Sequence, residues 1–121
     1  MEIKSYRDLV VWQKAVDLSI EIYKLTSTFP KEEVYGLVSQ MRRSAISIPS
    51  NIAEGKCRGT KKDFANFLKI AFGSGAELET QIVITKRLPF GTKLNYNIID
   101  RLLEEVMKML NSLISHLKTN D

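Results

Sequence analysis

Cysteine and histidine are almost missing from this chain of 121 residues, which has one of each, Cys57 and His116. A single cysteine excludes an internal disulfide and cannot hold a metal ion alone, so a reducing cytoplasm is the expected setting. A single histidine close to the end of a chain is more often solvated than catalytic, and no nucleophile-elbow motif accompanies it. Hydrolytic catalysis is therefore not expected.

Long apolar runs are also missing, and none approaches the roughly 18 residues that a membrane span needs. Charged residues interrupt the first residues, so no export signal is expected either. Di-metal bundles use a Glu-x-x-His pair on each of two helices, and the sequence has no such pair. Residues 55–59 lack the spacing of a phosphate-binding loop. We expect a cytoplasmic protein that is not an enzyme, with no metal, no cofactor and no membrane contact.

The composition fits one folded domain over residues 1–121, with 44% hydrophobic and 26% charged residues. Apolar residues recur at spacings of three and four, which predicts four helices, at roughly 6–26, 31–55, 60–88 and 95–118. No strand pattern, repeat or linker is visible. Long helices with short connections favour an all-α, antiparallel up-down-up-down four-helix bundle. The wide apolar face of the first helix would leave some surface for another subunit.

Pro49 lies inside the second predicted helix. An interior proline removes one backbone hydrogen bond and costs about 3 kcal/mol, so the helix is expected to bend there. Hydroxyl groups of residues 44–47, or a water, could compensate the carbonyl that loses its partner. Two helices broken at Pro49 are the alternative; the bend is favoured because the apolar spacing continues through the proline without a change of phase.

A stripe of small and hydrogen-bonding side chains runs along the other side of this helix. It consists of Gln40, Ser44, Ser47, Asn51 and Glu54. The stripe is either the solvated side of an amphipathic helix or a buried network that fixes helix register or a subunit interface. A buried Glu54 would need a cationic partner, and Arg43 or Arg58 is expected to supply it.

All of the net charge of +4 falls within residues 30–62, because the rest of the chain is balanced. The candidate phosphate-binding residues are Arg42, Arg43, Lys56, Arg58, Lys61 and Lys62. A local basic patch attracts polyanions, although charged loops also simply keep proteins in solution. Nothing resembles a recognition helix or an aromatic stacking platform, so base-specific readout is not expected.

Four motifs carry a family resemblance. They are residues 8–15 (DLVVWQKA), 29–37 (FPKEEVYGL), 47–55 (SIPSNIAEG) and 73–79 (GSGAELE). Together they resemble the four-helix bundle proteins encoded by intervening sequences of bacterial large-subunit ribosomal RNA genes. The resemblance implies the same bundle and adds that relatives can assemble as five-membered rings. Relatives encoded beside diversity-generating reverse transcriptases serve as accessory proteins that bind the polymerase and nucleic acid.

The sequence thus favours a nucleic-acid or ribonucleoprotein binding protein that contacts RNA or DNA phosphates through its basic segment. The resemblance implies a ring-forming homo-oligomer, with a pentamer as the expected state. The alternative is a homo-oligomeric adaptor that binds another protein and makes no direct contact with nucleic acid.

Overall fold

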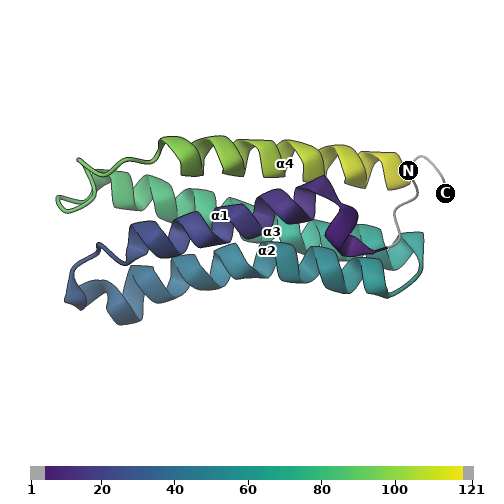
Figure 1. Cartoon of the computed structure of the whole chain (residues 1–121), viewed down its shortest axis with the longest axis horizontal. Helices are drawn as coiled ribbons and strands as arrows, with labels where there is room; N and C mark the ends of the chain where they lie inside the picture. Colours follow the sequence, from purple (N-terminus) through teal and green to yellow (C-terminus); the bar gives the residue numbers. More distant parts are fainter. Residues whose placement is uncertain (1–4, 119–121) are drawn as a thin grey trace.

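Four segments of helical periodicity form four long helices in the computed structural model, which describes residues 5–118 (Figure 1). They are α1 (Val10–Thr26), α2 (Ser39–Cys57), α3 (Lys61–Arg87) and α4 (Asn97–Lys118). Three short turns, η1 (Tyr6–Asp8), η2 (Lys31–Glu33) and η3 (Val34–Val38), precede α1 and α2. No strand occurs among the described residues, which confirms the all-α class with four helices.

The first two helices begin later than the sequence predicted, at residues 10 and 39 instead of 6 and 31. Ser5 and Asp8 form a capping box around η1, and the extended backbone of Leu9 (φ −75°, ψ 124°) then separates this turn from α1. Before α2, Gly36 has non-helical dihedral angles (φ −108°, ψ −109°) and lies in a π-type turn. Glycine is the weakest helix former after proline, so the regular ladder starts only after it.

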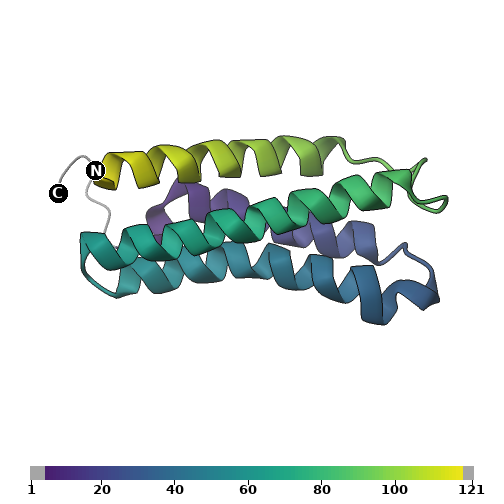
Figure 2. The ribbon, with the colours of Figure 1, turned by 180° about the vertical axis from the view of Figure 1, so that it is seen from behind.

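The helices lie side by side along the long axis, and the chain reverses direction at each connection between them (Figure 1). α1 packs against α2 and α4, and α3 packs against the same two helices. Seen from behind, α3 covers the face opposite α1 (Figure 2). One end of the bundle therefore holds the start of α1, the α2–α3 turn and the end of α4. No helix among residues 5–118 is long and apolar enough to span a membrane.

One apolar stripe of each helix fills the centre of the bundle. Its fully buried large side chains include Leu18, Ile22, Met41, Ile48, Ile52, Leu68, Leu78, Ile99, Val106 and Leu110. On α1, the predicted wide apolar face is buried only in part, along Val11, Ala15, Leu18, Ile22 and Leu25, because this helix packs mainly against two neighbours. The rest of this face leaves Ile20 and Tyr23 on the surface, 51% and 41% exposed.

α2 continues through Pro49 without a break, so the alternative of two separate helices is wrong. Proline has no N–H to donate to the carbonyl of Ala45, four residues earlier. Ser19 of α1 supplies a donor instead, because its Oγ lies 3.1 Å from Ala45 O and 3.0 Å from Ala15 O. The compensating hydroxyl therefore comes from a neighbouring helix and not from residues 44–47. The bend at Pro49 stays a prediction.

Two glycines allow close approach of helices. A Cβ added to Gly55 would lie 2.6 Å from the Cβ of Phe67, so α2 and α3 could not approach as they do near their shared turn. A Cβ on Gly75 would collide with Met107 Sδ of α4. Glycine at these positions lowers helix propensity by about 1 kcal/mol each and gains close helix packing in return.

Candidate nucleic-acid interface

The predicted basic segment is divided between the two ends of α2. Arg42 lies within the first turns of this helix, and Lys56 lies near its end. Fourteen residues at 1.5 Å per residue separate them by about 21 Å along the axis. Residues 42–62 therefore do not form one continuous patch, and each end has to be considered on its own.

Arg42 points toward α1 and not into solvent. Its Nε donates to Thr26 Oγ1 at 2.9 Å, and one terminal nitrogen lies 3.4 Å from Tyr23 O. The guanidinium also stacks over the Tyr23 ring, 4.3 Å from its centroid. A cation at a helix C-terminus stabilises the helix dipole and satisfies carbonyl groups there. Arg42 therefore joins α2 to the end of α1.

Lys56 and Arg58 lie at the α2–α3 turn and cover aromatic rings of α3. The Lys56 ammonium lies 5.5 Å from the Phe64 ring centroid, and the Arg58 guanidinium 4.9 Å from that of Phe67. Arg58 also donates to Glu54 Oε2 at 2.8 Å. This hydrogen bond is the main cause that raises the pKa of Arg58 above its ordinary value.

Lys61 and Lys62 stand at the start of α3, where they meet two lysines that sequence reasoning missed. Seven described residues line a groove of about 440 Å³ between α3 and the end of α4, called here the lysine groove. They are Lys61, Lys62, Ala65, Asn66, Lys69, Leu117 and Lys118. None of them is acidic. Lys69 lies seven residues after Lys62, on the same face of α3, and this spacing was visible in the sequence. Lys118 joins the groove only through helix packing.

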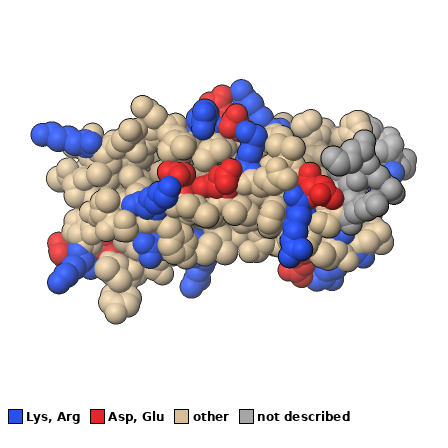
Figure 3. Space-filling model, viewed as in Figure 1, with Lys and Arg blue, Asp and Glu red and all other residues tan. Residues whose placement is uncertain are grey.

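Elsewhere on the surface, charges of both signs are mixed. On the face shown in Figure 3, Lys and Arg side chains alternate with Asp and Glu side chains, and no broad area of one sign is visible. Ion pairs such as Lys14–Glu105 (3.3 Å) connect some of them across helices. The lysine groove differs from this pattern because its four cations have no acidic neighbour among the residues that line it.

The predicted polar stripe of α2 divides into three parts. Ser47 and Asn51 form the network: Asn51 Nδ2 donates to Ser47 O (2.8 Å) and Oγ (2.9 Å). Ser47 Oγ also shares a hydrogen bond with Ser74 Oγ of α3 at 2.8 Å. The side chain of Glu54 is 53% exposed and pairs with Arg58, so it is not a buried carboxylate.

Gln40 and Ser44 belong instead to a polar groove of about 490 Å³ between α2 and α3, called here the polar groove. It is lined by Ser39, Gln40, Arg43, Ser44, Glu77 and Gln81. Arg43 thus faces α3 and lies apart from the lysine groove. The sequence placed Gln40 and Ser44 in one stripe of a helix. It could not show that they share a groove with Glu77 and Gln81 of another helix.

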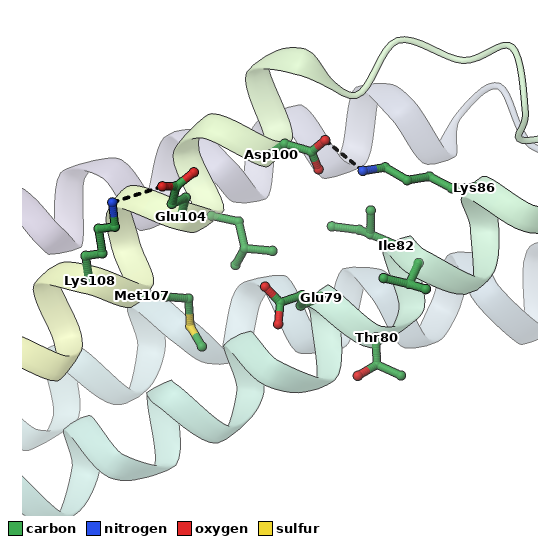
Figure 4. Close-up of a pocket in the computed structure, with 10 residues that line it drawn as sticks. Glu79, Thr80, Ile82, Lys86, Asp100, Glu104, Met107 and Lys108 are labelled. Atoms are coloured by element: carbon green, nitrogen blue, oxygen red, sulfur yellow. Dashed lines mark hydrogen bonds and ion pairs between the residues drawn. The ribbon is translucent and has the colours of Figure 1, made fainter.

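A third groove, of about 630 Å³, separates α3 and α4, and it is called here the α3–α4 groove (Figure 4). Its floor includes Ile82, Val83, Leu103 and Met107, and Met107 projects from α4 toward α3. Two ion pairs stand at its rim, Lys86–Asp100 (2.7 Å) and Lys108–Glu104 (2.9 Å). An apolar floor with a charged rim is the general character of a surface that binds another protein.

Within residues 5–118, no three His, Cys, Asp or Glu side chains come together to hold a metal ion. His116 is exposed near the end of α4, and Cys57 is exposed at the end of α2. Neither lies in the lysine groove or the polar groove.

Comparison with known proteins gives the family. The profile of the family described as "23S rRNA-intervening sequence protein" matches residues 7–112. The chain belongs to this family. A crystal structure of a protein of unknown function from the S23 ribosomal protein family of Bacteroides thetaiotaomicron VPI-5482 is similar, with a TM-score of 0.75 and 29% sequence identity. The similarity covers 87% of this chain and 98% of that one. No curated protein matches the sequence. The family inferred from the four motifs is confirmed.

Proposed function

We propose that this family member is a non-enzymatic cytoplasmic protein that binds RNA or DNA, alone or within a ribonucleoprotein, through its lysine groove. The supporting observation is that four lysines from two helices surround one groove, and that none of the described residues lining it is acidic. In an up-down-up-down bundle, the start of α3 and the end of α4 share one end, which is why these lysines meet. Lys56 lies at the same end and extends the positive potential, whereas the charge of Arg58 is paired with Glu54.

The chemistry of the groove fits phosphate groups better than bases. Lysine ammonium groups are point charges that attract phosphate without reading sequence. Single-stranded nucleic acid is usually held by stacking on exposed aromatic rings. Here the nearest rings, Phe64 and Phe67, are half-buried and lie under Lys56 and Arg58. The groove is therefore suited to the backbone of a folded RNA or a duplex.

The first experiment compares salt dependence in two triple variants. One replaces Lys61, Lys62 and Lys69 with Ala, and its matched control replaces Lys31, Arg87 and Lys93, which are exposed cations at the opposite end of the bundle. Both variants lose three positive charges. Binding of a labelled RNA hairpin and a labelled DNA duplex is measured by fluorescence anisotropy at several salt concentrations.

If each of the three lysines neutralises one phosphate, the slope of log K against log[salt] for duplex DNA falls by about 2.7 in the groove variant. The control variant is expected to retain the wild-type slope. Equal weakening in both variants would mean that net charge, and not the lysine groove, governs binding. If the wild-type protein binds neither probe, the nucleic-acid function itself is refuted.

A protein-binding adaptor is the second candidate, and the α3–α4 groove favours it. Apolar floor residues give binding that weakens little with salt, in contrast to phosphate contacts. Both candidate functions, nucleic-acid binding and protein binding, are compatible with a ring-forming homo-oligomer. The exposed apolar side chains Ile20 and Tyr23 of α1 offer one surface for contact between subunits. Light scattering of the purified protein measures the absolute mass and tests the pentamer directly.

A further inference from the structure

The polar groove combines six polar side chains that form no side-chain hydrogen bond or ion pair with residues 5–118. They are Ser39, Gln40, Arg43, Ser44, Glu77 and Gln81. Further along the α2–α3 contact, polar side chains do pair, because Asn51 bonds to Ser47 and Ser47 bonds to Ser74. Ser39, Gln40, Arg43 and Glu77 are exposed to solvent, so the group that lacks a partner in the interior is the buried oxygen of Gln81.

Burial makes one of these groups expensive to leave unpaired. Gln81 Oε1 is buried and has no hydrogen-bond partner among the described residues. A buried acceptor without a partner costs about 1–3 kcal/mol. Gln81 lines the groove together with Ser44, which is 6% exposed, so a ligand that enters the groove can donate a hydrogen bond to the Gln81 oxygen.

The two walls of the groove carry opposite charges. Arg43 of α2 offers only donors, whereas Glu77 of α3 offers only acceptors, and Gln81 places its buried oxygen one helical turn from Glu77. Arg43 and Glu77 do not form an ion pair with each other, although the helices that carry them are packed together. Because the two charged groups do not pair, a ligand that contacts both walls needs an anionic group for Arg43 and a separate cationic group for Glu77.

We propose that the polar groove binds a dipolar small molecule, with a carboxylate at Arg43 and a cationic nitrogen at Glu77 and Gln81. Its volume of about 490 Å³ falls in the range of small-molecule sites. A basic amino acid has the required chemistry, because several carbon atoms separate its side-chain cation from its carboxylate. The site is independent of the lysine groove and of the nucleic-acid function proposed above.

L-arginine is the first probe, and the reporter is the side-chain amide signal of Gln81 in nitrogen-15 NMR spectra. Two further probes each lack one charge: agmatine has no carboxylate, and L-norvaline has no guanidinium. We expect a saturable shift of the Gln81 signal with L-arginine, at a Kd of about 1 mM, and binding about tenfold weaker for each of the other probes.

Two variants assign the charges, and each has a matched control. Glu77→Gln should weaken L-arginine binding about tenfold, whereas Glu79→Gln, two residues along α3, should not. Arg43→Ala should remove the preference for L-arginine over agmatine, whereas Arg87→Ala should preserve it. Unchanged signals in the rest of the spectrum show that each variant is folded.

Three results would overturn the proposal: no saturable shift of the Gln81 signal, equal binding of L-arginine and agmatine, or equal effects of Glu77→Gln and Glu79→Gln. The triple variant of Lys61, Lys62 and Lys69 should bind L-arginine as the wild type does. This variant separates the two sites. If it loses RNA binding but still binds L-arginine, the polar groove is a binding site independent of the lysine groove.

Discussion

Replacement of Ser19 by Ala should reveal how much the free energy of unfolding depends on a donor that compensates for Pro49 inside α2. In the wild type, the Ser19 hydroxyl lies 3.1 Å from the Ala45 carbonyl that proline leaves without a donor. Ala45 is fully buried. Without the hydroxyl, its carbonyl loses a donor in the interior, where such a loss costs about 1–3 kcal/mol. We expect Ser19→Ala to lower the free energy of unfolding by about 1–2 kcal/mol.

A double-mutant cycle with Pro49→Ala isolates the link between the two residues. Alanine at position 49 has an N–H that can donate to Ala45 O, so the hydroxyl of Ser19 is no longer needed there. In that background Ser19→Ala should cost about 0.5 kcal/mol or less, giving a coupling energy of about 1 kcal/mol. The cycle cancels the effect of proline on the unfolded chain, which would otherwise confuse the comparison.

Urea denaturation followed by circular dichroism measures all four proteins. Ser27→Ala is the matched control, because Ser27 also donates to a backbone carbonyl (Lys24 O, 2.7 Å) but in solvent. Its loss should change stability by about 0.5 kcal/mol at most. If the effects of Ser19→Ala and Pro49→Ala add without coupling, the hydroxyl does not compensate the proline, and the explanation given for the unbroken helix is wrong.

Two other contacts give testable stability effects. Tyr96 donates its hydroxyl to Gly91 O at 2.7 Å, and burial, with the Asp100 carboxylate second, raises its pKa above the ordinary value of about 10. The stability that the protonated hydroxyl of Tyr96 contributes is complete below pH 10 and is lost as the pH rises through the folded pKa. Tyr96→Phe should therefore lower the free energy of unfolding by about 1 kcal/mol at pH 7 and reduce the loss of stability above pH 10. Parallel curves of stability against pH for the two proteins would contradict this. In the urea assay, Arg42→Ala should lower the free energy of unfolding by about 1–2 kcal/mol. The same variant should leave the salt dependence of RNA binding unchanged. A reduced slope would mean that Arg42 contacts phosphates.

The helices and most of the core could be predicted because local periodicity determines them. Met41, Ala45, Ile48 and Ile52 recur at spacings of four, three and four, and all four are fully buried. The late start of α2 was not predicted, because the turns before Ser39 leave no mark on the apolar spacing. Breaks of this kind depend on a few dihedral angles, which a periodic pattern does not report.

The candidate site was harder to predict because its side chains come from different helices. Nothing in the sequence indicated that Arg42 would stack on Tyr23, since the two residues meet only after α1 and α2 pack. Lys118 enters the lysine groove for the same reason, from the far end of the chain. Counting charge along residues 30–62 identified a basic segment correctly but could not show that the helix length would divide it.

The motif of residues 47–55 accounts for helix packing and not for chemistry. Ser19 of α1 donates to the carbonyl that Pro49 leaves without a donor, and Asn51 holds Ser47, which bonds to Ser74 of α3. Gly55 allows the close approach of Phe67. Each contact fixes how α2 sits against a neighbour, so the motif identifies the fold strongly. The lysine groove and the polar groove lie beyond its two ends and use none of its residues. Substitutions in the motif should therefore act on stability, and those in the grooves on binding, which makes the two classes of variant separable in experiment.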